Sequence, residues 1–322
     1  MSEVTKASVA TEGGHWYRCN DGRIEQIDEV IGRNGKRRKP TLRDARKSGG
    51  AWMPGVTTIM KMAAAPQLER WRMQQLCKAT IELGGPWSEV DDDGQLTSEQ
   101  FSNYCTRAMD RANEYAAKAR DVGTEVHSAL HRYVTCDQFR QEENMRGFQL
   151  LFGTYVTGVW RELREFFEEW ETDQLEQLPD ATDQASFSLW HGVKREDWRS
   201  EEAVHHPLGY ATKADLWTPA ADGWLFDFKG KQTAEDLKPT MYEQHHMQLA
   251  ATREAIEHTH GVKIPHGHCR IIYFARDLRD QGQAMIADED AKGIEKGWRM
   301  FKSLLSYWQS KNDYEGLRER VT

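Results

Sequence analysis

Two side chains able to do chemistry interrupt an otherwise apolar stretch near residue 227. The segment GWLFDFKGK, residues 223–231, reads as a buried strand that carries Asp227 and Lys229 two positions apart. Side chains alternate along a strand, so both groups are expected on one face. Carboxylate oxygens bind hard divalent cations, and a neighbouring ammonium can act on a water molecule at such an ion. The pattern therefore favours metal-assisted chemistry.

A second acid, Asp215, is expected opposite the first. GYATKADLWT and GWLFDFKG are joined by PAADG, whose turn-forming residues predict a hairpin centred on Ala221. This register makes Asp215 face Asp227, and two carboxylates that face each other in a sheet repel unless a cation lies between them. The other pairs expected on this face are Trp217 with Leu225 and Lys213 with Lys229.

The spacing alone leaves a second interpretation open. Asp215 would then be a surface acid, and Asp227 would pair with Lys229 on a solvated face of the sheet. A D-x-K triplet occurs by chance in many chains, so this motif needs further support.

Periodicity predicts the elements that position these groups. The strand-like segments EEAVHHPL, GYATKADLWT, GWLFDFKG and CRIIYFAR alternate with two helical segments, MYEQHHMQLAATREAIEH and IEKGWRMFKSLLSYW. Strands that alternate with helices predict an α/β core, here a mixed sheet flanked by helices. We therefore expect residues 201–322 to form a catalytic α/β core.

The preceding part, 15–200, is expected to be mainly helical and to belong to the same single domain, 15–322, behind a flexible segment 1–14. Its apolar residues recur at spacings of three and four from about residue 145 to 170, which predicts a core helix. A further helix is expected over much of 98–120.

Shorter signals precede these helices. HWYRC and IEQIDEVI read as short strands, and the basic run of residues 32–50 reads as an exposed loop, either a solvated linker or an arm that contacts phosphates. Thr57 or Thr58 is placed to cap one helix, and Pro66 to open the next. Gly123 and Thr124 are expected to introduce the helical segment EVHSALHRYV.

Composition restricts the class of partner and the compartment. The formal net charge is −8, so a polyanion would have to meet a locally basic surface. The five cysteines, Cys19, Cys77, Cys105, Cys136 and Cys269, are scattered and contain no CxxC pair, which favours a reducing cytoplasm over a disulfide framework or a zinc or iron–sulfur site. We expect no membrane segment and no secretory signal.

Histidine patterns offer weaker alternatives. His127 and His131 have the spacing of a helical zinc pair, but Ser128 occupies the position of a zincin's catalytic glutamate. In the segment HGHC, residues 266–269, a strand would point the cysteine away from both histidines. On pattern alone, His127 is expected to be an ordinary core histidine.

The ordered motifs resemble the PD-(D/E)XK nuclease superfamily, in particular its RecB-like, phage-type exonuclease branch. GYATKADLW, DFK and YEQHHMQLAA follow one another as in that family, and MPGVTTIMKMAAAPQLERW and KARDVGTEVHSAL resemble its upstream segments. The resemblance covers about residues 51–250. It implies a restriction-endonuclease-like fold, with a largely helical N-terminal half.

The resemblance also implies roles for single residues. The metal ligands would be His127, Asp215, Asp227 and the backbone carbonyl of Phe228. Lys229 would orient and help to deprotonate the attacking water, and Gln248 would contact this lysine or the scissile phosphate.

Three positions fit the family less well. Glu201 stands where relatives often have an acid, but Glu202 beside it makes the assignment ambiguous. Thr212 and Lys213 replace a small Gly-Thr pair, and Thr252 replaces an aromatic residue, which affects fine substrate contacts more than the metal site.

The function implied by the resemblance is hydrolysis of DNA phosphodiester bonds with Mg²⁺ or Mn²⁺, as an exonuclease on linear ends in phage-type recombination or DNA processing. A histidine ligand would tilt the preference toward Mn²⁺. The resemblance is also compatible with a recombination partner protein and with a homo-oligomer. The alternatives are a nuclease-like module that binds DNA or protein without cleavage, and a structure-specific endonuclease.

Overall fold

The computed structural model describes two compact units of the chain. Residues 14–20, 23–63, 66–90, 94–135, 158–159, 161–163, 165–167, 169, 197–280 and 282–316 are described. The first unit combines Met1–Ala63 with Ala129–Thr322, and the second comprises Ala64–Ser128.

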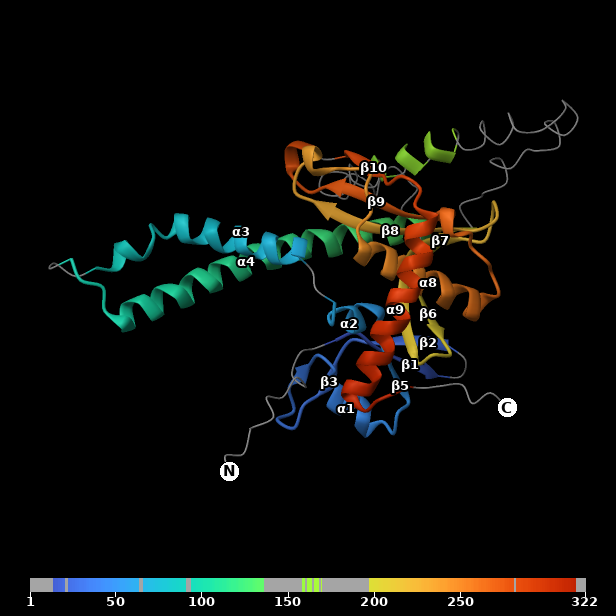
Figure 1. Ribbon diagram of the computed structural model, residues 1–322, viewed down its shortest axis with the longest axis horizontal. Helices are drawn as coiled ribbons and strands as arrows, with labels where there is room; N and C mark the ends of the chain where they lie inside the picture. Colours follow the sequence, from blue (N-terminus) through green and yellow to red (C-terminus); the bar gives the residue numbers. More distant parts are fainter. Residues whose placement is uncertain are drawn as a thin grey trace, which may run out of the picture. The chain divides into compact units, whose positions relative to one another are not determined.

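A five-stranded mixed sheet forms the centre of the first unit, in the order β10-β9-β8-β7-β6 (Figure 1). Its strands are β6 (Arg199–His206), β7 (Tyr210–Thr218), β8 (Trp224–Lys231), β9 (Cys269–Ala275) and β10 (Ala284–Ile286). All neighbours are antiparallel except β8 and β9, which are parallel. A parallel pair needs a crossover connection, and the helix α8 (Glu243–His260) supplies it. The expected mixed α/β core with flanking helices is confirmed.

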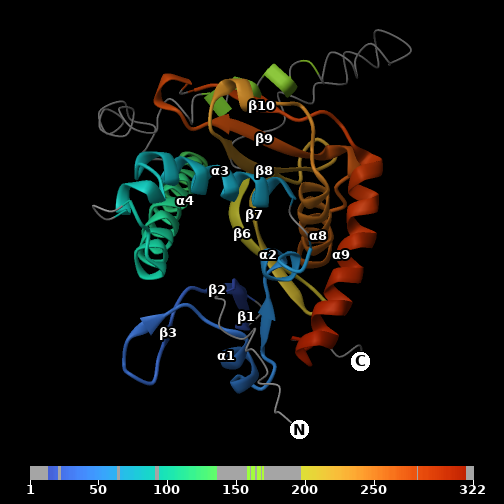
Figure 2. The same cartoon turned by 60° about the vertical axis from the view of Figure 1, so that its left-hand side comes forward.

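Helix α8 packs against strands β6 to β9, and α9 (Ala291–Asn312) packs along α8 (Figure 2). The contact is close because α9 carries Gly297 where the two helices meet. A Cβ atom at this position would lie 2.5 Å from the backbone carbonyl of His246 in α8. Both helices are where the sequence predicts them.

Aromatic side chains cover the opposite side of β8. The described residues between 158 and 169 are helical, and Val159, Leu163 and Phe167 on one face of that helix are buried. The ring of Phe167 packs edge-on against Trp224 and Phe226 of β8. The core helix predicted near residue 160 is confirmed for these residues; the rest of its range lies outside the described residues.

A second, three-stranded sheet lies in the same unit. It has the order β2-β1-β5 and consists of β1 (Trp16–Asn20), β2 (Arg23–Ile27) and β5 (Trp52–Pro54). A parallel bridge between Gly55 and Ala211 joins it to β7. Residues 14–63 thus add strands to the first unit, and the part expected to be mainly helical begins only at Pro66.

The basic run 32–50 is not the exposed loop that the sequence predicts. It contains β4 (Arg37–Arg38), which pairs with β3 (Val30–Ile31), and the helix α1 (Leu42–Lys47). Asp44 stabilises the start of α1, because its carboxylate accepts from the Thr41 N–H and pairs with the Arg38 guanidinium at 2.7 Å. The buried Ala45 anchors the helix in the core.

The cap predicted for the next helix is also wrong. Helix α2 (Val56–Met60) begins after Gly55, not after Thr57 or Thr58. The Thr58 hydroxyl instead accepts from the His15 N–H at 2.9 Å, so it ties α2 to the segment before β1.

The second unit is built from α3 (Pro66–Glu82) and α4 (Ser98–Thr135), with the short 3-10 turn η2 (Pro86–Glu89) between them. Pro66 opens α3 as predicted, whereas α4 runs without interruption through Gly123. The two helices are joined by the Tyr104 hydroxyl, which donates to the Thr80 carbonyl at 3.1 Å. None of the helices in the described parts of the chain has the length and apolar character needed to cross a membrane.

Candidate functional site

The predicted hairpin has the predicted register. Strands β7 and β8 pair through Leu216 with Phe226, Trp217 with Leu225, and Thr218 with Trp224. Among these pairs the one nearest to Asp215 is that of Leu216, the residue that follows it, and none of them includes Asp215 itself. The carboxylate of Asp215 takes over, because its Oδ2 accepts the Phe228 N–H at 2.9 Å.

Asp227, Lys229 and Gln248 form a closed triangle between β8 and α8. The Lys229 ammonium lies 2.5 Å from Asp227 Oδ2, and Gln248 Nε2 donates to Asp227 Oδ1 at 2.6 Å. Lys229 Nζ also donates to Gln248 Oε1 at 3.1 Å. The contact between Gln248 and the lysine that the resemblance implies is therefore present.

Burial separates this triangle from a solvated surface pair. The pairing of Asp227 with Lys229 that the alternative interpretation predicts is present, but Asp227 is only 5% exposed, so this face of the sheet is not a solvated one. Burial lowers the pKa of Lys229, but the charges of Asp227 and Asp215 outweigh it, so the pKa of this lysine is raised overall. Lys229 is therefore a cation at neutral pH when carboxylates are its only ionic partners.

Glu201 is the acid that sequence reasoning left ambiguous. The pairs Ser200 with Leu216 and Glu202 with Ala214 place Glu201 opposite Asp215. One carboxylate oxygen of Glu201 lies within 4.8 Å of one from Asp215. The neighbouring Glu202 turns elsewhere and accepts from Trp217 Nε1 at 2.9 Å. The register of β6 against β7, which the sequence does not specify, would have resolved the choice.

The backbone is distorted at Glu201. Its φ is +55°, a region that residues other than glycine seldom adopt. Residues in such conformations cost of order 1–3 kcal/mol and gather at functional sites, where the surrounding structure holds them. This distortion is an independent reason to include Glu201 in the site.

Strand β7 also departs from strict alternation, which corrects two predicted contacts. Ala214 and Trp217 both lie in the main core, although residues three positions apart on a regular strand face opposite sides. Lys213 forms an ion pair with Glu201 on the neighbouring strand β6, and not the predicted contact with Lys229. This break in alternation at Asp215 also turns its carboxylate toward the Phe228 N–H. The sequence predicts only that Asp215 faces Asp227.

Tyr17 of β1 is a buried neighbour of the two acids, and no sequence motif points to this tyrosine. Burial raises the pKa of its hydroxyl, and the nearby charges of Glu201 and Asp215 raise it further. The ring packs with Met53 and Ala211. Its hydroxyl therefore stays protonated at neutral pH.

The contacts of Asp215, Asp227 and Glu201 do not test the two other predicted metal ligands, His127 and the Phe228 carbonyl. His127 lies on α4 in the second unit, and the helix continues into the first unit at Ala129. Ligation by this imidazole stays a prediction. The Phe228 N–H binds Asp215, and the role implied for the Phe228 carbonyl also stays a prediction.

The HGHC segment serves packing. His266–His268 forms a 3-10 turn, so the expected strand geometry begins only at Cys269. The His268 ring stacks on Trp224 with centroids 3.9 Å apart, and Cys269 is fully buried. No group of three metal-ligating side chains among the described residues includes either of them.

The donor set fits a hard divalent cation. Glu201 and Asp215 offer carboxylate oxygens close enough for one ion to bridge, and oxygen ligands bind Mg²⁺ and similar ions at about 2.0–2.6 Å. Asp227 Oδ2 is buried, and among the described residues it has no hydrogen-bond donor besides the Lys229 ammonium that pairs with it. Glu201 and Asp215 are half-buried and Asp227 is buried, and carboxylates withdrawn from water favour a cation as their partner.

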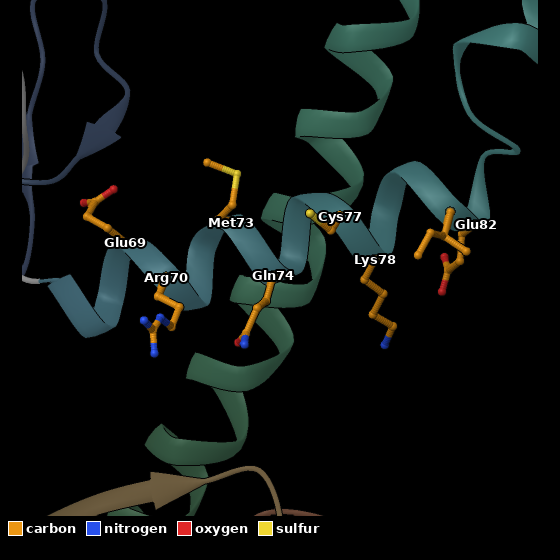
Figure 3. A pocket seen from close by; sticks show the side chains of 8 residues that line it. Glu69, Arg70, Met73, Gln74, Cys77, Lys78 and Glu82 are labelled. Carbon is orange, nitrogen blue, oxygen red and sulfur yellow. The ribbon is translucent and has the colours of Figure 1, made fainter.

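A surface hollow in the second unit contains none of these groups. It is lined by α3 side chains, among them Glu69, Met73, Cys77 and Ile81 (Figure 3). It is open and is formed by the side chains of a single helix.

No family model matches the chain, and no curated protein matches it. The site is defined by its geometry.

Proposed function

We propose that this protein is a metal-dependent deoxyribonuclease with a restriction-endonuclease-like core, and that it acts as an exonuclease on linear DNA. The observation that carries the proposal is the convergence of Asp215, Asp227, Lys229 and Gln248 from β7, β8 and α8. Three antiparallel strands followed by a crossover helix and a parallel strand also suit the fold expected from the resemblance.

Glu201, Asp215 and Asp227 would hold Mg²⁺ or Mn²⁺, and His127 would be a further ligand. A bound divalent cation supplies positive charge for the phosphate oxygens and lowers the pKa of an attacking water.

Lys229 and Gln248 would position the reacting groups. Gln248 holds both Asp227 and Lys229, which limits the rotamers of the lysine and directs its remaining N–H groups. The ammonium would orient the attacking water and bind a non-bridging phosphate oxygen. Such contacts to the backbone carry little sequence information, so cleavage is expected to depend weakly on sequence.

The resemblance also implies the process, which is phage-type recombination or DNA processing in the cytoplasm with a partner protein. The described cysteines Cys19, Cys77, Cys105 and Cys269 are free thiols, which fits a reducing compartment.

The test is to incubate labelled linear, covalently closed and single-stranded DNA with Mg²⁺, Mn²⁺ or a chelator. We expect linear DNA to be lost in either metal, closed circles to be spared, and the chelator to stop the reaction. Lys229→Met should abolish cleavage, while Lys311→Met on α9 should not. Normal cleavage by Lys229→Met would overturn the proposal.

Two other outcomes favour the alternatives. Cutting of closed circles at the rate of linear DNA would indicate an endonuclease. DNA binding without cleavage in either metal would indicate a binding module.

A further inference from the structure

A second lysine follows the catalytic candidate on the same strand. Lys231 lies two residues beyond Lys229 at the end of β8, and side chains two apart on a strand share a face about 6.8 Å apart. Its ammonium lies 4.6 Å from the centre of the Tyr273 ring and 5.1 Å from that of Tyr242. The two rings hold the ammonium in place through cation–π contacts.

This ammonium is half-buried and forms no ion pair with the acids of the described residues. Charged side chains are seldom removed from water unpaired. Burial lowers its pKa, the charge of Asp236 opposes this, and the smaller effects of Lys238 and Arg276 lower the pKa further. The site gathers positive charge on a chain whose net charge is −8.

The arrangement brings a third cation close. Gly230 has no side chain between Lys229 and Lys231, and a Cβ there would lie 2.8 Å from Arg276 Cδ. Without it, Arg276 lies against the strand and donates from Nε to the Lys231 carbonyl at 3.2 Å. Repelling cations at this spacing are stabilised when an anion binds among them.

His245 of α8 borders the same cluster without adding or removing charge. Burial and the charges of Lys229 and Lys231 lower the pKa of its imidazole to about 3, so the ring is neutral at physiological pH. Its Nδ1 accepts from the Tyr242 N–H at 3.3 Å and lies 3.1 Å from the Tyr273 hydroxyl. The ring therefore fixes both tyrosines that hold Lys231.

We propose that Lys231, held by Tyr242 and Tyr273, binds a backbone phosphate of the DNA strand next to the phosphate at Lys229. This inference rests on the proposed nuclease function and extends it with a second contact to the same strand. The contact would set the position of the strand along β8 and be independent of base sequence.

The test measures binding apart from cleavage. A fluorescein-labelled DNA duplex is titrated with the protein in Ca²⁺ in place of Mg²⁺, at several salt concentrations, and Kd is read from anisotropy. Each phosphate contact contributes about 0.9 to the slope of log K against log salt. Lys231→Gln should reduce that slope by about 1 and weaken binding about 3- to 10-fold at moderate salt.

Two variants control the result. Lys231→Arg keeps the charge and should bind as the parent does. Lys311→Gln removes a lysine that also lies over a tyrosine, at 5.9 Å from the Tyr307 ring on α9, and should leave the slope unchanged. If Lys231→Gln does not fold, Tyr242→Leu carries the test, because it removes one ring of the support and should weaken binding in the same direction.

The failures are distinguishable. If the parent protein binds and cleaves DNA while Lys231→Gln and Tyr242→Leu keep its slope and Kd, the phosphate contact is wrong and the nuclease proposal stands. If the parent protein neither binds nor cleaves DNA, the nuclease proposal fails and the phosphate contact fails with it.

Discussion

At the scale of single residues, the paired carboxylates of Glu201 and Asp215 are the clearest sign of a cation site. Their oxygens lie within 4.8 Å of each other, and the backbone at Glu201 is strained. The adjacent acid Glu202 is bound to Trp217 instead. Neighbouring glutamates with different partners provide a matched pair for mutation.

We expect Mn²⁺ to raise the thermal midpoint of the parent protein, and Glu201→Gln or Asp215→Asn to remove most of this shift. A ligand at a hundredfold excess over its Kd stabilises a fold by about 2.7 kcal/mol. Differential scanning fluorimetry with and without the metal measures the effect. Glu202→Gln should keep the shift, and an equal shift in all variants would exclude these carboxylates as ligands.

At the scale of elements, Gln248 is the polar tie between α8 and β8. We expect Gln248→Leu to cost about 1–3 kcal/mol of unfolding free energy, because Asp227 Oδ1 and Lys229 then lose a partner in a mostly buried place. Urea denaturation measures this cost. Thr252→Val, one turn later on α8, removes a hydroxyl that is hydrogen-bonded only within the helix and should cost less. Equal costs would contradict a stabilising role of Gln248 between α8 and β8.

Close packing of α8 and α9 leads to another prediction. Gly297→Ala should destabilise the fold by about 1–3 kcal/mol, because the added methyl meets the His246 backbone, which cannot easily move. Gly123→Ala in α4 is the control: nothing lies within 4 Å of its Cβ position, so the better helix former should stabilise by up to about 1 kcal/mol. Two effects of the same sign in urea unfolding would contradict the packing argument.

Strongly periodic elements were predictable, and those that depend on distant contacts were not. Strands β6 to β9 and helices α8 and α9 follow from alternation and from the spacing of apolar residues. Helix α1 depends on the Arg38–Asp44 ion pair and on burial of Ala45, which no local pattern reveals.

The site divides in the same way. Asp215, Asp227, Lys229 and Gln248 follow from motifs in sequence order. Glu201 needed the register between β6 and β7, and Tyr17 reaches the acids from a strand far away in sequence.

At the scale of the molecule, the half-buried His206 makes stability depend on pH. Burial, with smaller effects from His258, His205 and Lys302, lowers the pKa of His206 to about 4. The unfolded chain titrates near 6.5, so between these values it binds more protons than the folded chain, and stability falls as the pH is lowered.

We therefore expect the urea midpoint to fall between pH 7 and pH 5, and to fall less in His206→Phe. The phenyl ring keeps the stacking on Tyr210, whose ring centroid lies 5.1 Å from that of His206, but cannot take up a proton. His266→Phe serves as the control outside this cluster. If both variants show the pH dependence of the parent, His206 is not its source.

Trp16 of β1 packs against Trp308 of α9 and Tyr314, with ring centroids 6.1 and 5.8 Å apart, and the Tyr314 hydroxyl donates to the Trp52 carbonyl at 2.6 Å. A ribosome adds about 5–20 residues per second, so the partners of Trp16 emerge roughly 15–60 s after it does. During translation the Trp16 side chain of the small β2-β1-β5 sheet therefore stays exposed until α9 has been made. We expect holdase chaperones to bind this exposed side chain in that interval.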